Sequence, residues 1–263
     1  MLLAYLEVLL DLYPGRLKAC CMPRSLAAQL MGHFGIATKL GLSAASSRPR
    51  DDSVVTWKYL TGEVADGSKI SELIEGYRKL TSAEIPDGLY EALTEALTNV
   101  RQHAYPAGSN TPDALRRWWL FAKYEEPSGG NVGKLFVGVY DIGLGIQQSM
   151  RKHLLPTEKL LDVTGTFLEW TGLEGTSKLE RLLLTEAVER NRSSTGLDFR
   201  GNGLPEMRDF VLKTTSGRLS IVSGSSQYTT LAKSQSSSAN SSRPILGTLI
   251  LWSIPLDAKE IAI

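Results

Sequence analysis

Residues 140–146, with the sequence YDIGLGI, place an acid at the end of an apolar strand and follow it with two glycines. A carboxylate at a strand end can accept a hydrogen bond from an exocyclic amine, and glycines let a ligand approach the backbone closely. Asp141, Gly143 and Gly145 are therefore candidates for a ligand-binding loop, with a plain Asp-Gly turn as the simple alternative. The segment does not fit a Rossmann fingerprint, because Gln148 stands where the third glycine would fall.

A second glycine-rich segment, residues 195–210, runs into an amphipathic helix. A loop of this kind before a helix offers free backbone N–H groups and the positive end of the helix dipole, which together suit a phosphate chain. Gly201 and Gly203 provide the freedom of the loop, and Arg200 can add a charge-assisted contact. Thr248, at the start of a later strand, can bring a hydroxyl to the same ligand. A flexible loop and a core strand are the simple alternatives.

Four polar residues recur at every fourth position between residues 87 and 105: Glu91, Glu95, Asn99 and His103. Residues four apart in an α-helix differ by about 40° in direction, so these side chains share one side of the predicted helix. Taken alone, the pattern is typical of a solvated helix face with capping acids. Asn99 calls for a functional reason, however, because asparagine is a poor helix former in mid-helix. His103 is interpreted as a packing or capping residue at the helix end.

Composition limits the class of protein. The chain has 263 residues, of which 42% are hydrophobic and 22% are charged, as in an ordinary globular protein. Its net charge of +1 provides no overall field toward nucleic acid or an anionic membrane. Residues 1–13 are apolar but much shorter than the roughly 20 residues that cross a bilayer. Cys20 and Cys21, which are adjacent, lack metal-ligand spacing and favour a reducing, cytoplasmic setting.

Hydrophobic periodicity predicts the elements that position these motifs. Helices are expected at residues 1–13, 24–34, 70–80, 87–105, 177–189 and 204–212, and strands at 54–60, 116–124, 134–141, 218–223, 227–233 and 245–254. The Ser-rich residues 234–244 are expected to form a flexible hairpin loop. This order predicts an α+β fold, a two-layer sandwich of a mixed, mainly antiparallel sheet with helices on one face.

The order of the motifs resembles the ATP-binding domain of the GHKL superfamily, which includes the histidine kinases. The similarity covers about residues 54–256, and the joint match is specific although each motif is weak. EALTEALTNVRQHAY, residues 91–105, looks most like the serine kinases that act as bacterial anti-sigma factors. The resemblance implies a Bergerat-type fold over residues 51–263, with an ATP lid at about residues 147–203. Residues 1–50 then form a short helical segment and linker that caps the sheet or docks a partner.

The resemblance also implies roles for individual residues around Mg²⁺ and ATP. Asn99 matches the residue that coordinates Mg²⁺, and Glu95 matches the carboxylate that orients or deprotonates the attacking group. Asp141 matches the acid that reads the adenine amino group, and Thr248 matches a position behind the adenine. The remaining implied nucleotide-binding residues are Gly143, Gly145 and Ile146 beneath the base and Arg200, Gly201, Asn202, Gly203 and Leu204 in the phosphate-covering segment.

Three functions are compatible with these motifs. The first is a Mg²⁺-dependent ATPase or protein serine kinase that acts on a regulatory protein partner, and Glu95 favours it. The second is a non-catalytic module whose nucleotide-dependent lid closure exposes or hides a partner surface. The third, a degenerate domain that binds no nucleotide, is disfavoured because all the glycine positions are filled. A homodimer is compatible with each, and neither a nucleic-acid nor a membrane partner is indicated.

Overall fold

Seven strands form one sheet in which every strand pair of the described residues is antiparallel. The computed structural model describes residues 1–18, 25–42, 51–81, 83–106, 111–112, 115–130, 132–154, 177–189 and 203–256. The strands, in the spatial order β1-β2-β3-β7-β4-β5-β6, are β1 (Trp57–Gly62), β2 (Trp118–Glu125), β3 (Gly133–Asp141), β7 (Thr248–Leu256), β4 (Arg218–Ser223), β5 (Ser226–Leu231) and β6 (Ser237–Asn240). The α+β class is confirmed, and the sheet is antiparallel rather than mixed.

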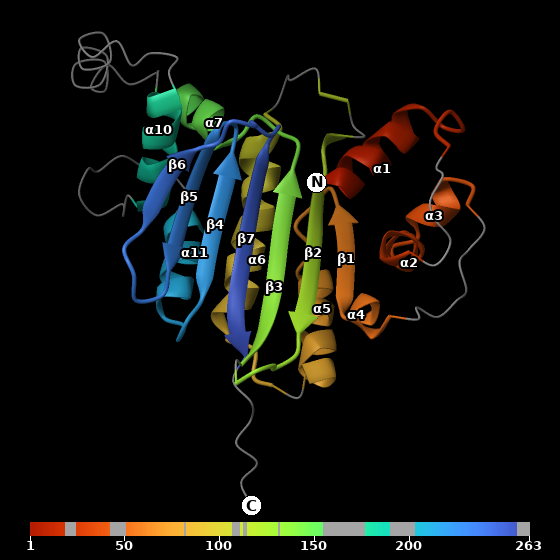
Figure 1. The fold of residues 1–263 in the computed structure, drawn as a ribbon. Coiled ribbons are helices and arrows are strands. Elements are labelled where there is room, and N and C mark those ends of the chain that lie inside the picture. The colour runs from red at the N-terminus through yellow and green to blue at the C-terminus, as the bar shows by residue number, and fades with distance from the viewer. Residues whose placement is uncertain are drawn as a thin grey trace, which may run out of the picture.

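One face of the sheet packs against a layer of helices that holds the main core (Figure 1). Alternate residues of the central strands, such as Val137 and Val139 of β3, point into this layer because side chains alternate along a strand. The layer contains α5 (Gly67–Thr81), α6 (Gly88–Asn99), α10 (Ser177–Glu189) and α11 (Gly203–Leu212). A π-helix, η1 (Val100–Ala104), continues α6, and α7 (Ile146–Leu154) follows β3.

The second face of the sheet is covered in part by the N-terminal helix, α1 (Leu2–Leu12). Ala4 and Val8 of α1 form a buried cluster with Trp119 and Tyr140, whose side chains point away from the main core. The prediction of helices on one face is therefore wrong for this region. The physical reason is that β2 carries Trp118 and Trp119 in succession, so a large apolar side chain must be buried on each face. The division between residues 1–50 and 51–263 stays a prediction.

Buried Glu7 joins α1 to three other elements. Its carboxylate accepts hydrogen bonds from the Trp119 indole nitrogen at 2.9 Å, from the Tyr59 hydroxyl, and from Lys39 Nζ at 2.9 Å. Burial alone would raise the pKa of Glu7, but the hydrogen bonds from Lys39, Tyr59 and Trp119 and the charge of Lys39 hold it below its ordinary value. Lys39 belongs to α3 (Ile36–Lys39), which follows α2 (Leu26–His33). Residues of these helices and of α1 share one hydrophobic cluster, and the contact of Lys39 with Glu7 ties this cluster to the part of α1 that lies on the sheet.

Two local predictions are wrong. Residues 54 and 55, expected in a strand, belong to the short helix α4 (Asp52–Val55), because the Asp51 side chain caps it by accepting from the Ser53 N–H at 3.0 Å. Within the Ser-rich segment, β6 pairs with β5 instead of remaining a loop. The Tyr228 hydroxyl donates to Ser236 Oγ at 2.8 Å and fixes the turn between them. In the described part of the chain, no helix combines the length and the apolar character needed to span a membrane.

Replacing Glu7 with alanine should lower the free energy of unfolding by about 2–4 kcal/mol, since it leaves the indole N–H and the Tyr59 hydroxyl buried without their acceptor. Lys39 adds little because its side chain is half exposed. Urea denaturation measures the change. The control is Glu75→Ala in α5, which removes an exposed ion pair with Lys79 and should cost less than about 0.5 kcal/mol. Equal losses in both variants would contradict the role of Glu7.

Candidate functional site

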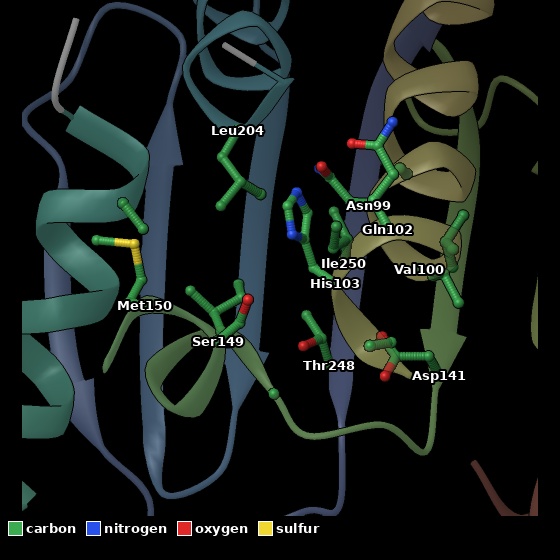
Figure 2. A pocket seen from close by; sticks show the side chains of 16 residues that line it. Asn99, Val100, Gln102, His103, Asp141, Ser149, Met150, Leu204, Thr248 and Ile250 are labelled. Carbon is green, nitrogen blue, oxygen red and sulfur yellow. The ribbon is translucent and has the colours of Figure 1, made fainter. Parts of the chain in front are cut away.

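A pocket of about 450 Å³ opens where α6 and η1 face α7 and the first turn of α11, at the ends of β3 and β7. Figure 2 shows its side chains converging on one space, with Leu204 and Met150 across from His103 and Asn99. The volume lies in the range of small-molecule sites. Six of the residues singled out from the sequence line this pocket: Asn99, Asp141, Gly145, Ile146, Leu204 and Thr248.

Asp141 is the buried acid of this pocket, with 5% of its surface exposed. It is the last residue of β3 and lies opposite Thr248, the first residue of β7. The Gly143 N–H donates to Asp141 Oδ1 at 2.7 Å, and the Thr248 backbone N–H also donates to the carboxylate. Loss of hydration outweighs these two bonds and raises the pKa of Asp141 to about 7. A buried acceptor with a strongly shifted pKa in a pocket is typical of a functional group.

The loop after β3 is held from both sides. The Ile142 N–H donates to the Tyr105 hydroxyl at 3.1 Å, and the Ile146 N–H donates to Ser223 Oγ at 2.9 Å. Gly145 has φ of 81°, a left-handed conformation that other residues rarely adopt, so the glycine is required for this turn. These two hydrogen bonds hold the loop against Tyr105 on one side and against the end of β4 on the other, so that its backbone faces the pocket.

Helix α11 lies close to α6 at Gly203. A Cβ atom at this position would lie 2.7 Å from Glu95 Oε2 and 3.1 Å from Asn99 Nδ2. Such a contact is too short, so glycine allows the N-terminal end of α11 to lie directly beside these two side chains. The structure thus joins the predicted helix face and the second glycine segment in one place.

Glu95 is not among the residues that line the pocket, and its side chain is only partly exposed. Burial raises the pKa of its carboxyl, and the charge of Glu206 in the first turn of α11 raises it further. The two carboxylates therefore repel each other near the N-terminal end of α11, and a cation there would relieve their repulsion. In the described residues, no group of three or more His, Cys, Asp or Glu side chains is arranged to hold a metal by itself.

Sequence reasoning missed several walls of the pocket. Gln102 and His103 line it from η1, although His103 was interpreted as a packing residue. The four-residue spacing already included His103, but the π-helix that continues α6 had no sequence signal. Ser149 and Met150 of α7 and Ala187 of α10 also line the pocket. These three belong to the segment predicted as the lid, whose mixed, glycine-punctuated sequence did not indicate which residues turn inward.

Part of the predicted site lies outside the described residues. Arg200, Gly201 and Asn202 belong to this part, as do residues 155–176 and 190–202 of the predicted lid at about residues 147–203. Their predicted contacts with phosphate remain predictions.

Comparison of the chain with models of known protein families, with curated protein sequences and with solved structures finds no significant match.

The buried Asp141 predicts a pH-dependent gain of stability in Asp141→Asn. The Asp141 carboxyl keeps its proton up to about pH 7 in the folded chain but loses it near pH 3.8 in the unfolded chain. The wild type therefore loses stability as the pH rises between these values. The variant, which carries no such proton, should be more stable than the wild type above pH 7 by at most about 4 kcal/mol. The difference should vanish below about pH 4. Denaturant unfolding at several pH values measures it.

Asp66→Asn is the control for this prediction, because a hydrogen bond from Ser68 holds the pKa of Asp66 below its ordinary value. A lowered pKa of a carboxyl stabilises the folded chain at high pH, whereas a raised pKa destabilises it. Asp66→Asn should therefore gain no stability at high pH. A pH-independent difference between wild type and Asp141→Asn would contradict the burial of an uncharged Asp141.

Proposed function

We propose that this pocket binds ATP together with Mg²⁺, and that the chain is a GHKL-type ATP-binding protein with a Bergerat-type fold. One observation carries the proposal: a single pocket gathers Asn99, Asp141 and Thr248 and the N-terminal end of α11, although they come from four separate segments of the chain. The sequence resemblance rests on the order of these same motifs. Their convergence in one pocket supports an ATP site.

The Asp141 end of the pocket suits an adenine ring. Val139 and Ile250, paired across β3 and β7, form an apolar wall, and Met150 lines the pocket from α7. Such walls suit the faces of a flat base, while a carboxylate accepts a hydrogen bond from an exocyclic amine. Asp141 would thus select adenine over a base that presents a carbonyl oxygen at that place.

The opposite end suits the phosphates. The first turn of α11 has backbone N–H groups without partners in the helix and the positive end of the helix dipole, and both favour a phosphate. Asn99 lies beside this turn and supplies an amide oxygen, a ligand type that Mg²⁺ accepts alongside phosphate oxygens and water. When bound, Mg²⁺ would neutralise the charge of the triphosphate and reduce its repulsion with Glu95 and Glu206.

Glu95 is the residue that would act on the attacking group. Its carboxylate lies against Gly203, next to the proposed phosphate position, and its raised pKa makes it a stronger base than an ordinary glutamate. It would orient a water molecule or a protein hydroxyl in line with the terminal phosphate and accept its proton. A water molecule gives ATP hydrolysis, whereas a serine hydroxyl of a partner gives protein phosphorylation.

Glu95 and Asn99 should give different defects. Glu95→Gln keeps the side-chain volume and removes the base, so ATP turnover should fall about 10²–10⁴-fold while ATP affinity stays within about threefold. Asn99→Ala should instead abolish the increase of ATP affinity that Mg²⁺ provides and retain binding without metal. Phosphate release and calorimetric titration with and without Mg²⁺ measure the two effects.

Glu72→Gln, an exposed carboxylate on α5, is the control and should match the wild type in both measurements. If Glu95→Gln hydrolyses ATP at the wild-type rate, Glu95 has no catalytic role, and ATP binding would serve a nucleotide-dependent interaction module instead. If Asn99→Ala keeps its full dependence on Mg²⁺, the metal assignment is wrong.

A further inference from the structure

A second cavity, of about 590 Å³, lies between α6 and α11 near the start of α6 and the end of β7. Its wall is largely apolar, with Pro86, Ala92, Phe210 and Pro255. We refer to it as the α6–α11 groove. It is distinct from the proposed nucleotide pocket: the residues that line the two do not overlap.

Carboxylates dominate the rim of the α6–α11 groove. Glu91 on α6 and Glu206 and Asp209 on α11 line it, against the single cation Lys213 among the lining residues. Asp209 pairs with Arg208 at 3.4 Å, whereas no ion pair between described residues engages Glu91 or Glu206, and both are exposed. The chain as a whole carries a charge of only +1, so this local excess of negative charge is not a general property of its surface.

The groove also leads toward the proposed site of chemistry. Glu91 lies one helical turn before Glu95 on α6, and Glu206 lies three residues after Gly203, which contacts Glu95. A chain segment bound between α6 and α11 would therefore end close to Glu95 and to the first turn of α11. Only this link to catalysis rests on the proposed function.

We propose that the α6–α11 groove binds a segment of a protein partner in which an apolar side chain is flanked by lysine or arginine. The apolar side chain would pack between Phe210 and the two prolines, where water is displaced from an apolar surface. The flanking cations would meet Glu91, Glu206 and Asp209, which gives specificity for basic over acidic segments. If the proposed function holds, a serine in such a segment would be presented to Glu95.

A positional-scanning library of synthetic peptides, each with a central leucine, tests this with the 263-residue chain. Fluorescence anisotropy at low salt should show peptides with flanking Lys or Arg binding at least about tenfold more tightly than those with flanking Glu or Asp, and salt should reduce the difference. No preference, or preference for acidic flanks, would overturn the proposal.

Two variants locate the binding. Glu91→Lys combined with Asp209→Lys should lose the preference for basic flanks, and the milder Glu91→Gln with Asp209→Asn should reduce it; thermal unfolding checks that each variant is folded. Glu72→Lys, which changes an exposed charge on α5 outside the groove, should keep the preference. An unchanged preference in both groove variants would overturn the proposal.

ATP titration of the wild type separates this result from the proposed function. Selection of basic peptides without ATP binding would support the groove and contradict the nucleotide site. ATP binding without selection of basic peptides would support the nucleotide site and contradict the groove.

Discussion

Strands β3 and β7 run side by side through the middle of the sheet, and their register places Asp141 opposite Thr248. Side chains alternate along both strands, so a shift of one residue would turn Asp141 from the pocket to the face that α1 covers. Both faces near the end of β3 are packed, by the helical layer on one side and by Ala4 and Val8 on the other. The core on both faces therefore specifies this register, and the pocket depends on it.

Burial of Asp141 costs free energy that the rest of the fold must offset. Two backbone N–H groups donate to its carboxyl, yet the pKa still rises to about 7 because hydration is lost. A leucine or valine at this position would avoid that cost. A carboxyl at such a position does not serve stability, and the proposed recognition of a ligand would account for it.

The sequence predicted the elements that carry the site. Periodicity located α6, β3 and α11 to within a few residues, because each has an apolar face with the period of its structure. The motif residues Asn99, Asp141, Leu204 and Thr248 were singled out separately and line one pocket.

Other features of the fold had no local sequence signal. The π-helix η1 differs from α6 only in its hydrogen bonds, and β6 consists of small exposed residues that depend on pairing with β5. The contact of α1 with β2 and β3 joins residues more than 100 positions apart, which no local pattern can predict.

Calorimetric titration of the wild type with ATP and with GTP, in the presence of Mg²⁺, tests whether Asp141 recognises adenine. At pH 8, above the pKa of about 7 for Asp141, its carboxylate can accept from the amino group of adenine, whereas guanine presents a carbonyl oxygen at that position. ATP should bind at least about tenfold more tightly than GTP, as expected when one hydrogen bond is replaced by a repulsive contact. Absence of ATP binding at millimolar concentrations, or equal affinity for the two nucleotides, would contradict the recognition of adenine by Asp141.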